Sequence, residues 1–380
     1  MIDRDELAAW LRLVATPGVG REAARRLLGE FGSPQRTLDA STAARRPLVG
    51  DAAAAALAAE PPGFAALLAA TLAWLEGRPA DETGKGRDVL VLGDPRYPAS
   101  LLETADPPTL LYVEGRIELL RADAIAIVGS RNPTAQGLEN ARVFASHLSR
   151  AGLVVVSGLA LGIDGAAHEG ALEGQGAGET GGTIAAVGTG LDLVYPSRHR
   201  ALAHRIATAG LLVSEFPIGT ASRPENFPIR NRIIAGLARG TLVVEAAMRS
   251  GSLITARLAL EAGREVFAIP GSIHSPQARG CNALLKQGAK LVDSATDILA
   301  EFSLARPAPA DDRSGAVEPV RPGRDDPVLA ALGFDPMSLD ALVARTGMSA
   351  AELSARLLDL ELAGRVARLP GQVFQRVERG

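Results

Sequence analysis

The segment Ala124-Ile125-Ala126-Ile127-Val128-Gly129-Ser130-Arg131-Asn132-Pro133-Thr134 decides the fold. It begins with five apolar residues in a row, which is the pattern of a parallel β-strand that is covered on both faces. Glycine and small polar residues then predict a turn, and an amphipathic stretch over 136–150 predicts a helix directly after it. A buried strand that leads through a glycine turn into a helix is the repeating unit of an α/β sheet.

The same unit recurs between residues 81 and 302. Apolar runs predict further strands at 89–92, 153–156, 183–187, 211–213, 241–244 and 265–269. Helical stretches follow at 197–209 and 252–262. Because parallel strands need crossover connections, this alternation predicts an α/β fold with a Rossmann-like, doubly wound and mostly parallel sheet.

Residues 1–80 predict a small helical domain of the SAM or helix-hairpin-helix type. One buried helical face is predicted by four apolar residues at helical spacing, Leu7, Trp10, Leu11 and Val14. The sequence Thr-Pro-Gly-Val-Gly over 16–20 fits two structures. It fits a helix-hairpin-helix whose backbone N–H groups approach a phosphate, or a tight turn between two helices. We favour the tight turn, because the motif is short.

The C-terminal part predicts a linker and a winged helix. Residues 303–326 carry four prolines among charged and small residues, without periodicity, so we expect a flexible linker. Residues 327–380 hold three helical stretches and then two short apolar runs around Pro370-Gly371, which is the order of a winged-helix domain. Its expected recognition helix, 350–362, carries three acidic residues against one arginine. Since acidic side chains repel phosphates, we expect a protein-interaction or accessory role for this domain.

Composition and charge exclude several classes of protein. The net charge is −3, so any nucleic-acid site must be a local basic patch. Cys281 is the one cysteine, which excludes a disulfide framework and a cysteine-rich zinc site. The first residues lack the basic and apolar stretches of a signal peptide, and no apolar run approaches the roughly 20 residues of a membrane-spanning helix. We therefore expect a cytoplasmic protein with no membrane partner.

The turns that follow the strands are the candidate site, because ligands of open α/β sheets bind beyond the carboxyl ends of the strands. Small residues in these turns leave N–H groups at helix N-termini available to phosphate oxygens. The candidates of this kind are Gly129, Ser130, Ser157, Gly158, Ser250, Gly251 and Ser252.

Basic and aromatic residues narrow the class of ligand. Arg131 lies in the first turn, and a second cluster consists of Phe227, Arg230, Asn231 and Arg232. Arginines for phosphates and an aromatic ring for base stacking are what a single-stranded nucleic acid requires. Structural interpretations also exist, because the arginines of the cluster could pair with Asp164 or Glu245, and its phenylalanine could belong to the core. The convergence of all these residues on one edge of the sheet favours the nucleic-acid site.

No cofactor, metal site or catalytic residue is predicted. Neither a G-x-G-x-x-G after the first core strand nor a G-x-x-x-x-G-K-S/T occurs, which argues against a dinucleotide cofactor and a P-loop ATPase. His168 could act as a general base, but no nucleophile or metal ligand accompanies it in the sequence. We favour a packed histidine that is hydrogen-bonded near Asp164.

Together these motifs resemble the DNA-processing protein DprA (Smf) family. The matches occur in family order over about residues 90–300, namely Val128-Gly129-Ser130-Arg131, Ser157-Gly158, Gly162-Ile163-Asp164, Tyr195-Pro196, Ser214-Glu215-Phe216-Pro217, Phe227-Pro228-x-Arg230-Asn231-Arg232, Val244-Glu245-Ala246, Ser250-Gly251-Ser252, Pro270-Gly271 and Gly280-Cys281-Asn282. The resemblance implies a non-enzymatic homodimer without a cofactor. Such a protein would bind single-stranded DNA, protect incoming strands and load the RecA recombinase in natural transformation. It also implies that the family's binding residues correspond to Arg131, Phe227, Arg230, Asn231 and Arg232.

Three positions depart from the family pattern. Leu161 stands where the family usually has arginine, so one positive charge of the site is missing or is supplied from elsewhere. His199 stands where the family often has asparagine. Residues 173–182 form an additional glycine-rich segment, which we expect to be a flexible surface insertion.

Two other functions remain open. A nucleotide phosphoribohydrolase would have a related sheet, but its Pro-Gly-Gly-x-Gly-Thr motif is replaced here by Arg249-Ser250-Gly251-Ser252. A transcriptional regulator would bind duplex DNA through the winged helix, and the acidic recognition helix argues against this function.

Overall fold

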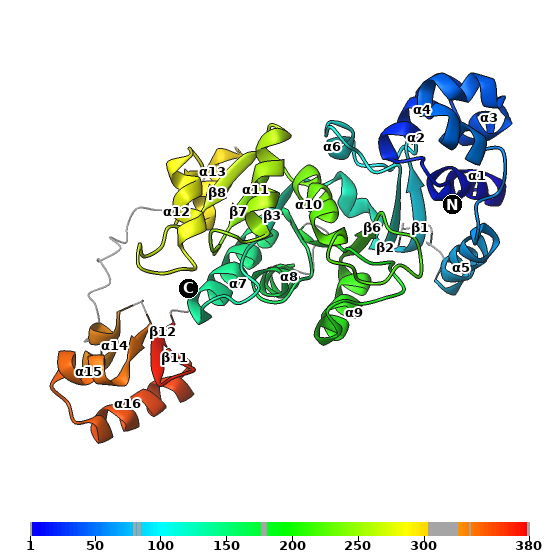
Figure 1. Cartoon of the computed structure of the whole chain (residues 1–380). Helices are drawn as coiled ribbons and strands as arrows, with labels where there is room; N and C mark the ends of the chain where they lie inside the picture. The colour runs from blue at the N-terminus through cyan, green and yellow to red at the C-terminus, as the bar shows by residue number, and fades with distance from the viewer. Residues whose placement is uncertain are drawn as a thin grey trace, which may run out of the picture.

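The computed structural model describes residues 2–78, 81, 85–175, 181–302, 326–333 and 336–377. Within these residues the centre is a nine-stranded sheet in the order β1-β2-β6-β5-β4-β3-β7-β8-β9, with helices on both faces (Figure 1). Neighbouring strands from β6 to β9 run parallel, whereas β2 pairs antiparallel with both β1 and β6. The predicted α/β fold with a mostly parallel sheet is therefore confirmed.

The strands are short, as predicted. They are β1 (Lys85–Val91), β2 (Leu110–Arg116), β3 (Ala124–Val128), β4 (Val154–Ser157), β5 (Gly182–Ala186), β6 (Leu211–Ser214), β7 (Gly240–Val243), β8 (Glu265–Ala268) and β9 (Lys290–Leu291). The predicted runs all lie on these strands, although β1 begins earlier than expected. Strands β2 and β9 were not predicted. The antiparallel edge formed by β1 and β2 is accordingly a feature that only the structure shows.

Helices connect the strands and cover both faces of the sheet. They are α6 (Ala99–Leu102), α7 (Ala135–Arg150), α8 (Ile163–Gly174), α9 (Arg200–Ala209), α10 (Asn226–Leu237), α11 (Ser252–Glu261), α12 (Arg279–Lys286) and α13 (Ala295–Glu301). The stretch predicted as a helix over 197–209 begins as a 3-10 turn at Ser197–His199 and continues as α9. Of the expected insertion, 173–182, residues 176–180 lie outside the described residues.

The order of the strands reverses at β3. The chain adds β4, β5 and β6 on one side of β3, and α10 then carries it back to β7 on the other side. The carboxyl ends of β3 and β7 therefore meet at a topological switch point, which is the usual ligand position in open α/β sheets.

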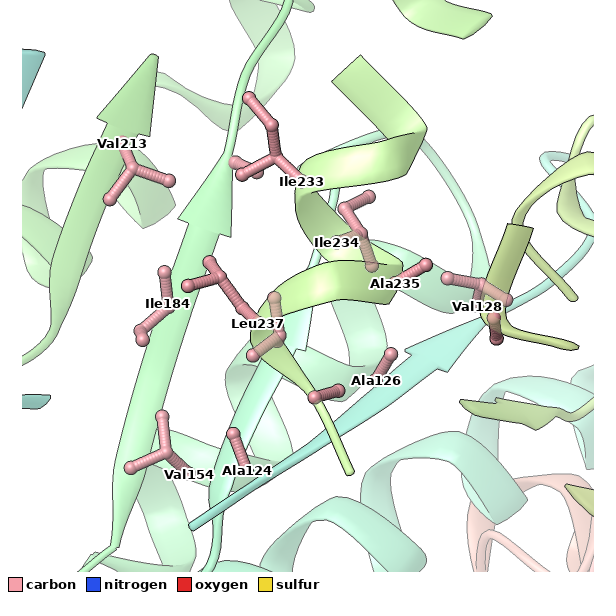
Figure 2. Close-up of a cluster of buried hydrophobic side chains, with 14 of the residues drawn as sticks. Ala124, Ala126, Val128, Val154, Ile184, Val213, Ile233, Ile234, Ala235 and Leu237 are labelled. Atoms are coloured by element: carbon pink, nitrogen blue, oxygen red, sulfur yellow. The ribbon is translucent and has the colours of Figure 1, made fainter. Parts of the chain in front are cut away.

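Alternate residues of β3 face two different layers of helices. Its even-numbered residues share a buried cluster with Ile233, Ile234 and Leu237 of α10 (Figure 2). Its two isoleucines, Ile125 and Ile127, belong to a second buried cluster with residues of α7 and α8 on the opposite face. This double coverage explains the continuous apolar run of the sequence. It also fixes α10 on the sheet directly beside the switch point.

Helices α1 (Arg4–Ala15), α2 (Arg21–Phe31), α3 (Pro34–Asp39), α4 (Thr42–Ala56) and α5 (Phe64–Gly77) precede the sheet. Three of the four residues predicted for the inner face of α1 are buried, and they form a cluster with Phe64, Trp74 and residues of β1 and β2. Val14 is partly buried at the edge of this cluster. Residues 16–20 form a short turn between α1 and α2. The exact division of the chain into domains stays a prediction.

The C-terminal residues form the predicted winged helix. It contains α14 (Pro327–Leu332), α15 (Leu339–Thr346), α16 (Ala350–Leu362) and a small sheet of β10 (Met337–Ser338), β12 (Val373–Arg376) and β11 (Val366–Leu369). The expected linker, 303–326, lies outside the described residues apart from Asp326. In the described parts of the chain, no helix is both long and apolar enough to cross a membrane.

Candidate nucleic-acid interface

A cavity of about 680 Å³ opens at the switch point between β3 and β7. Its walls come from the turn after β3, the first turns of α10 and the turn between β7 and α11. Nine predicted site residues line it, namely Gly129, Ser130, Arg131, Phe227, Arg230, Asn231, Ser250, Gly251 and Ser252. The structure thus brings together segments that are far apart in the sequence, from Gly129 to Ser252. Ser157, Gly158 and Arg232 do not line the cavity.

Close packing shapes the turn after β3. A Cβ atom at Gly129 would lie 2.6 Å from Cγ1 of Ile163, so only glycine fits this position. The Ser130 N–H donates to the carbonyl oxygen of Glu245 over 2.7 Å, and the Ser130 hydroxyl accepts from the N–H of Asn132. These contacts hold the next side chain, Arg131, exposed at the rim of the cavity.

Glu245 does not pair with an arginine, so the Glu245 part of the structural alternative is wrong, whereas Asp164 lies close enough to Arg230 to raise its pKa. Its carboxylate accepts hydrogen bonds from the hydroxyl and the N–H of Thr134, over 2.5 and 2.9 Å. Thr134 is the N-cap of α7. The carboxylate is therefore occupied in fixing the start of that helix.

One cation and two aromatic rings form a continuous rim. The guanidinium carbon of Arg131 lies 5.3 Å from the ring centroid of Phe227, within the range of a cation–π contact. The ring of Tyr195 lies 5.6 Å from that of Phe227 and is tilted by 36°. Tyr195 is 49% exposed and lines the cavity. Flat rings beside a guanidinium offer stacking surfaces for bases next to a donor for phosphate.

Arg230 is buried in the wall of the cavity, with 3% of its surface exposed. Its Nε and Nη1 atoms make no hydrogen bond within the described residues. Burial lowers the pKa of Arg230 to about 10, although the carboxylate of Asp164 acts in the opposite direction. Burial likewise raises the pKa of Asp164. A buried guanidinium with unsatisfied N–H groups carries a desolvation penalty that an anionic ligand in the cavity would offset.

Ser157 and Gly158 lie outside the cavity, and Gly158 adjoins this arginine. The Ser157 hydroxyl is fully buried and donates to the carbonyl oxygen of Ile127 over 2.6 Å, and contact of Ser157 with a ligand stays a prediction. A Cβ atom at Gly158 would lie 1.5 Å from Nη1 of Arg230. Gly158 therefore leaves the space that the guanidinium occupies.

The structure separates Arg232 from the other site residues. Its guanidinium pairs with the buried carboxylate of Glu215, which follows β6, and its Nε lies 3.2 Å from Asp106. Arg21 and Arg25 of α2 reach the same Asp106 over 2.8 and 2.6 Å. Arg232 thus lies outside the cavity, and its predicted contact with the nucleic acid stays a prediction. Residues two positions apart on a helix point in nearly opposite directions, and Arg232 faces the N-terminal helices.

The turn before α11 forms the remaining wall. Gly251 is the N-cap of α11, and no side chain caps the helix there. The hydroxyls of Ser250 and Ser252 lie 2.7 Å apart, and the amide of Asn231 donates to the Gly251 carbonyl over 3.4 Å. The first three N–H groups of α11 are hydrogen-bonded within the turn, to Ser250 and Gly251, so the helix N-terminus offers an anion its positive dipole end.

His168 is a structural residue, as predicted, but its partners differ from the expected ones. It is fully buried, and its Nε2 accepts the N–H of Leu159 while its Nδ1 lies 2.7 Å from the Thr183 hydroxyl. That hydroxyl donates to the Val155 carbonyl, so Nδ1 carries the proton. Burial lowers the pKa of His168 to about 3. The neutral ring therefore holds Leu159, whose φ is 57°, next to Gly158.

Several residues that were not predicted also line the cavity, among them Asn132, Tyr195 and Arg249. Tyr195 and Arg249 both lie in segments that follow strands, so their position beside the strand ends could have indicated them.

Leu161, the departure from the family pattern, does not line the cavity. Arg249 is exposed on the opposite wall and adds a third arginine. In the described parts of the chain, no group of His, Cys, Asp and Glu side chains could hold a metal ion.

Comparison with protein families gives two matches. Residues 88–303 match the family DNA recombination-mediator protein A, and residues 306–372 match the DprA winged helix domain. Protein Smf of Escherichia coli (strain K12) is 43% identical over 284 residues, which cover 72% of this chain and 74% of that protein.

Two solved structures are similar to this one. The DNA processing protein A (DprA) from Streptococcus pneumoniae superposes with a TM-score of 0.62 at 36% identity, covering 79% of this chain and 98% of that chain. DNA processing protein A from Helicobacter pylori, whose structure concerns its single-stranded DNA binding mode, gives a TM-score of 0.51 at 29% identity. That match covers 59% of this chain and 98% of the other.

Proposed function

This chain belongs to the family of DNA recombination-mediator protein A, and we propose that it binds single-stranded DNA in the cavity between β3 and β7. Arg230 carries the proposal. Its guanidinium is buried in the cavity wall, and two of its nitrogens make no hydrogen bond. Because unsatisfied buried donors are costly, this arrangement is best explained by an anionic ligand such as a phosphate.

The rim of the cavity favours a single strand over other anions. Bases that are splayed out of a helix can stack on Phe227 and Tyr195, while Arg131 and Arg249 contact the phosphates between them. A duplex hides its base faces and would leave these rings without a partner. The positive dipole end of α11 faces the same cavity, and it favours a phosphate whatever the base sequence.

We propose that the protein binds single strands without hydrolysing them or releasing their bases. Among the described residues that line the cavity, no nucleophile is paired with a general base in the manner of a hydrolase. His168, which could have been a general base, is buried and hydrogen-bonded on both ring nitrogens. Incubation of the protein with nucleotides and with labelled single strands tests this part. Release of free base or shortened strands would favour the phosphoribohydrolase or a nuclease instead.

The family supports two further proposals. We propose that the protein acts as a homodimer in the cytoplasm and that it loads the RecA recombinase on single strands that enter during natural transformation. Sedimentation of the full chain measures the first. The second predicts that the protein shortens the lag of RecA filament assembly on protected single strands, and an unchanged lag would contradict it.

Fluorescence anisotropy of a labelled single-stranded oligonucleotide tests the site. We expect wild-type protein to bind and Arg131→Ala to bind more weakly, with a dependence on salt that is shallower by about 0.7 for each phosphate that the variant no longer neutralises. Arg142→Ala is the control, because Arg142 pairs with Glu173 on the surface away from the cavity. Equal binding by wild type and Arg131→Ala would show that the cavity is not the site.

A further inference from the structure

Helix α16 of the winged helix has an inner and an outer apolar face. Its inner face carries Leu353, Leu357 and Leu360, which are buried in the core of the domain. Ser349 and Glu352 form a capping box that fixes the start of the helix. These contacts define how the helix is rotated and therefore which residues point outward.

The outer face is apolar as well. Four residues at positions i, i+4, i+7 and i+11 are exposed, namely Ala351, Ala355, Leu358 and Leu362. At 3.6 residues per turn they lie within an arc of roughly 60°. Leu358 is 55% exposed and Leu362 is 80% exposed. Single exposed leucines are common on proteins, but an aligned stripe on the outermost side of a helix is typical of a docking surface.

The rest of the described chain does not cover this stripe. Figure 1 shows α16 on the side of the winged helix that faces away from the central sheet, whereas β12 is on the near side. Strand β12 of the domain contacts α7 of the core. The outer face of α16 is therefore available to another molecule.

The charges beside the stripe select the kind of partner. Glu352 and Asp359 border it on one side and Glu361 borders it on the other. The one basic residue of the helix, Arg356, lies 3.3 Å from Asp326 of its own domain. The other arginines of the described domain lie on α15 and around the hairpin, at Arg345, Arg365, Arg368 and Arg376. The stripe is thus apolar with acidic borders.

These borders disfavour two of the possible occupants. Acidic side chains repel the phosphates of duplex DNA. A second copy of α16 laid along the stripe would bring carboxylates against carboxylates, which is destabilising. A helix with an apolar stripe bordered by lysine or arginine meets neither objection, because its leucines would cover Leu358 and Leu362 while its cations pair with the acidic borders.

We propose that the outer face of α16 docks a basic amphipathic helix of a partner protein. The interaction buries the two exposed leucines and pairs Glu352, Asp359 and Glu361 with basic residues. It assigns the winged helix a role in protein recognition that is independent of the strand-binding cavity.

A pair of synthetic peptides tests this proposal on the full-length chain. Both are labelled 18-residue helices with leucines at the same spacing, and one has lysine and the other glutamate on the borders of its stripe. We expect the lysine peptide to bind in an anisotropy titration and the glutamate peptide to bind at least about tenfold more weakly. Equal binding of the two peptides, or no binding of the lysine peptide, overturns the proposal.

Substitutions in α16 locate the interaction. Leu358→Ser with Leu362→Ser should weaken binding of the lysine peptide by at least about tenfold, since two leucine side chains no longer pack against the peptide. Asp359→Lys with Glu361→Lys should reverse the preference toward the glutamate peptide, and it leaves the capping box of Ser349 and Glu352 intact. Leu102→Ser is the matched control, because Leu102 is 52% exposed on α6 outside this domain. None of the substituted side chains is buried, so we expect the variants to fold, and circular dichroism measures whether they do.

Other occupants give different results. A change of sedimentation mass in the leucine variant without peptide would identify a second copy of the chain as the occupant. A loss of duplex DNA binding in the same variant would identify DNA. Either result overturns the proposal. Single-strand binding by the leucine variant should equal that of wild type, so failure of this proposal and failure of the strand-binding site are measured separately.

Discussion

Arg230 and Arg232 lie two residues apart on α10, yet their surroundings are opposite in character. Arg230 is buried in the wall of the cavity, and among the described residues no carboxylate lies within 4 Å of its guanidinium nitrogens. Arg232 is buried against Glu215 and also contacts Asp106. The first region has excess positive charge, whereas the second is an ion cluster that joins the N-terminal helices to the sheet.

The difference between Arg230 and Arg232 shows that burial alone does not tell whether an arginine stabilises the fold or contacts a ligand. A buried charge with its carboxylates in place is part of the framework, and removal of one member leaves the other unsatisfied. A buried charge without an ion-pair partner on a cavity wall is arranged for a ligand. Four predictions can break or sharpen this comparison.

Arg232→Met has the largest expected effect, and it acts on stability. Loss of the guanidinium leaves the Glu215 carboxylate buried, with Arg21 at 3.8 Å as the remaining cation. We expect the free energy of unfolding to fall by about 3 kcal/mol, measured by urea denaturation. Single-strand affinity of the folded protein should be unchanged.

Arg142→Met is the control for this change, because the Arg142–Glu173 pair is exposed and should contribute less than about 1 kcal/mol. If Arg232→Met kept its stability but lost affinity for single strands, Arg232 would be a ligand contact. The contrast between the two arginines would then disappear.

Arg230→Met should mainly lower the affinity for single strands, whereas Arg232→Met should mainly lower stability. Hydrogen bonds to charged groups contribute about 1.5–3 kcal/mol, so the affinity for single strands should fall about 10- to 150-fold. Its stability should change less than that of Arg232→Met, because Arg232 forms ion pairs with Glu215 and Asp106 and Arg230 forms none within the described residues. Anisotropy and urea denaturation measure the two effects on the same preparation.

Two variants sharpen this test. Arg239→Met, beyond the other end of α10, changes a similar side chain that is remote from the cavity and should keep its affinity. Gly158→Ala keeps the arginine but places a Cβ in the space of its Nη1. Weaker binding by Gly158→Ala would show that the position of the guanidinium matters and not its charge alone. Unchanged binding by both Arg230→Met and Gly158→Ala would contradict the assignment.

Phe227→Leu should weaken binding by about tenfold, since stacking of one base on an aromatic ring contributes about 1–3 kcal/mol. The charge of the cavity is unaltered, so the dependence of affinity on salt should keep its slope. Tyr195→Leu should act in the same direction, because the two rings are neighbours. A change of the salt slope in Phe227→Leu would show instead that the ring only supports Arg131.

His168 extends the comparison to a buried base that is neutral. Its pKa is lowered to about 3 from an ordinary value of 6.5, so between these pH values the unfolded chain binds a proton that the folded protein does not. The contribution of His168 is therefore complete above pH 6.5 and is lost as pH falls, by about 1.4 kcal/mol per pH unit.

Urea denaturation at pH 6.5 and pH 5.5 measures this effect. His168→Asn should lose less stability between the two pH values than wild type, whereas His147→Asn, a residue on the outer part of α7, should behave as wild type does. An identical pH dependence in wild type and His168→Asn would show that His168 is not the group that titrates.

Local patterns determined most of the fold and the place of the site. The apolar run of β3, its glycine turn and the helix after it follow from steric and hydrophobic preferences of neighbouring residues. The general rule for open sheets then placed the ligand at the strand ends, where the structure has its cavity. The winged helix was equally evident, because its helices and hairpin are continuous in sequence.

Only the tertiary structure decided what each charged or small residue does there. Arg230 and Arg232 are equivalent in sequence, and their roles differ because Glu215 and Asp106 come from distant segments. The same holds for Gly158, whose missing side chain makes room for an arginine 72 residues later. Strand β2 was not predicted, because its place in the sheet depends on backbone pairing with β1 and β6, which forms only in the assembled sheet. Secondary structure depends on near neighbours along the chain, whereas the environment of a charge depends on segments that folding brings together from far apart.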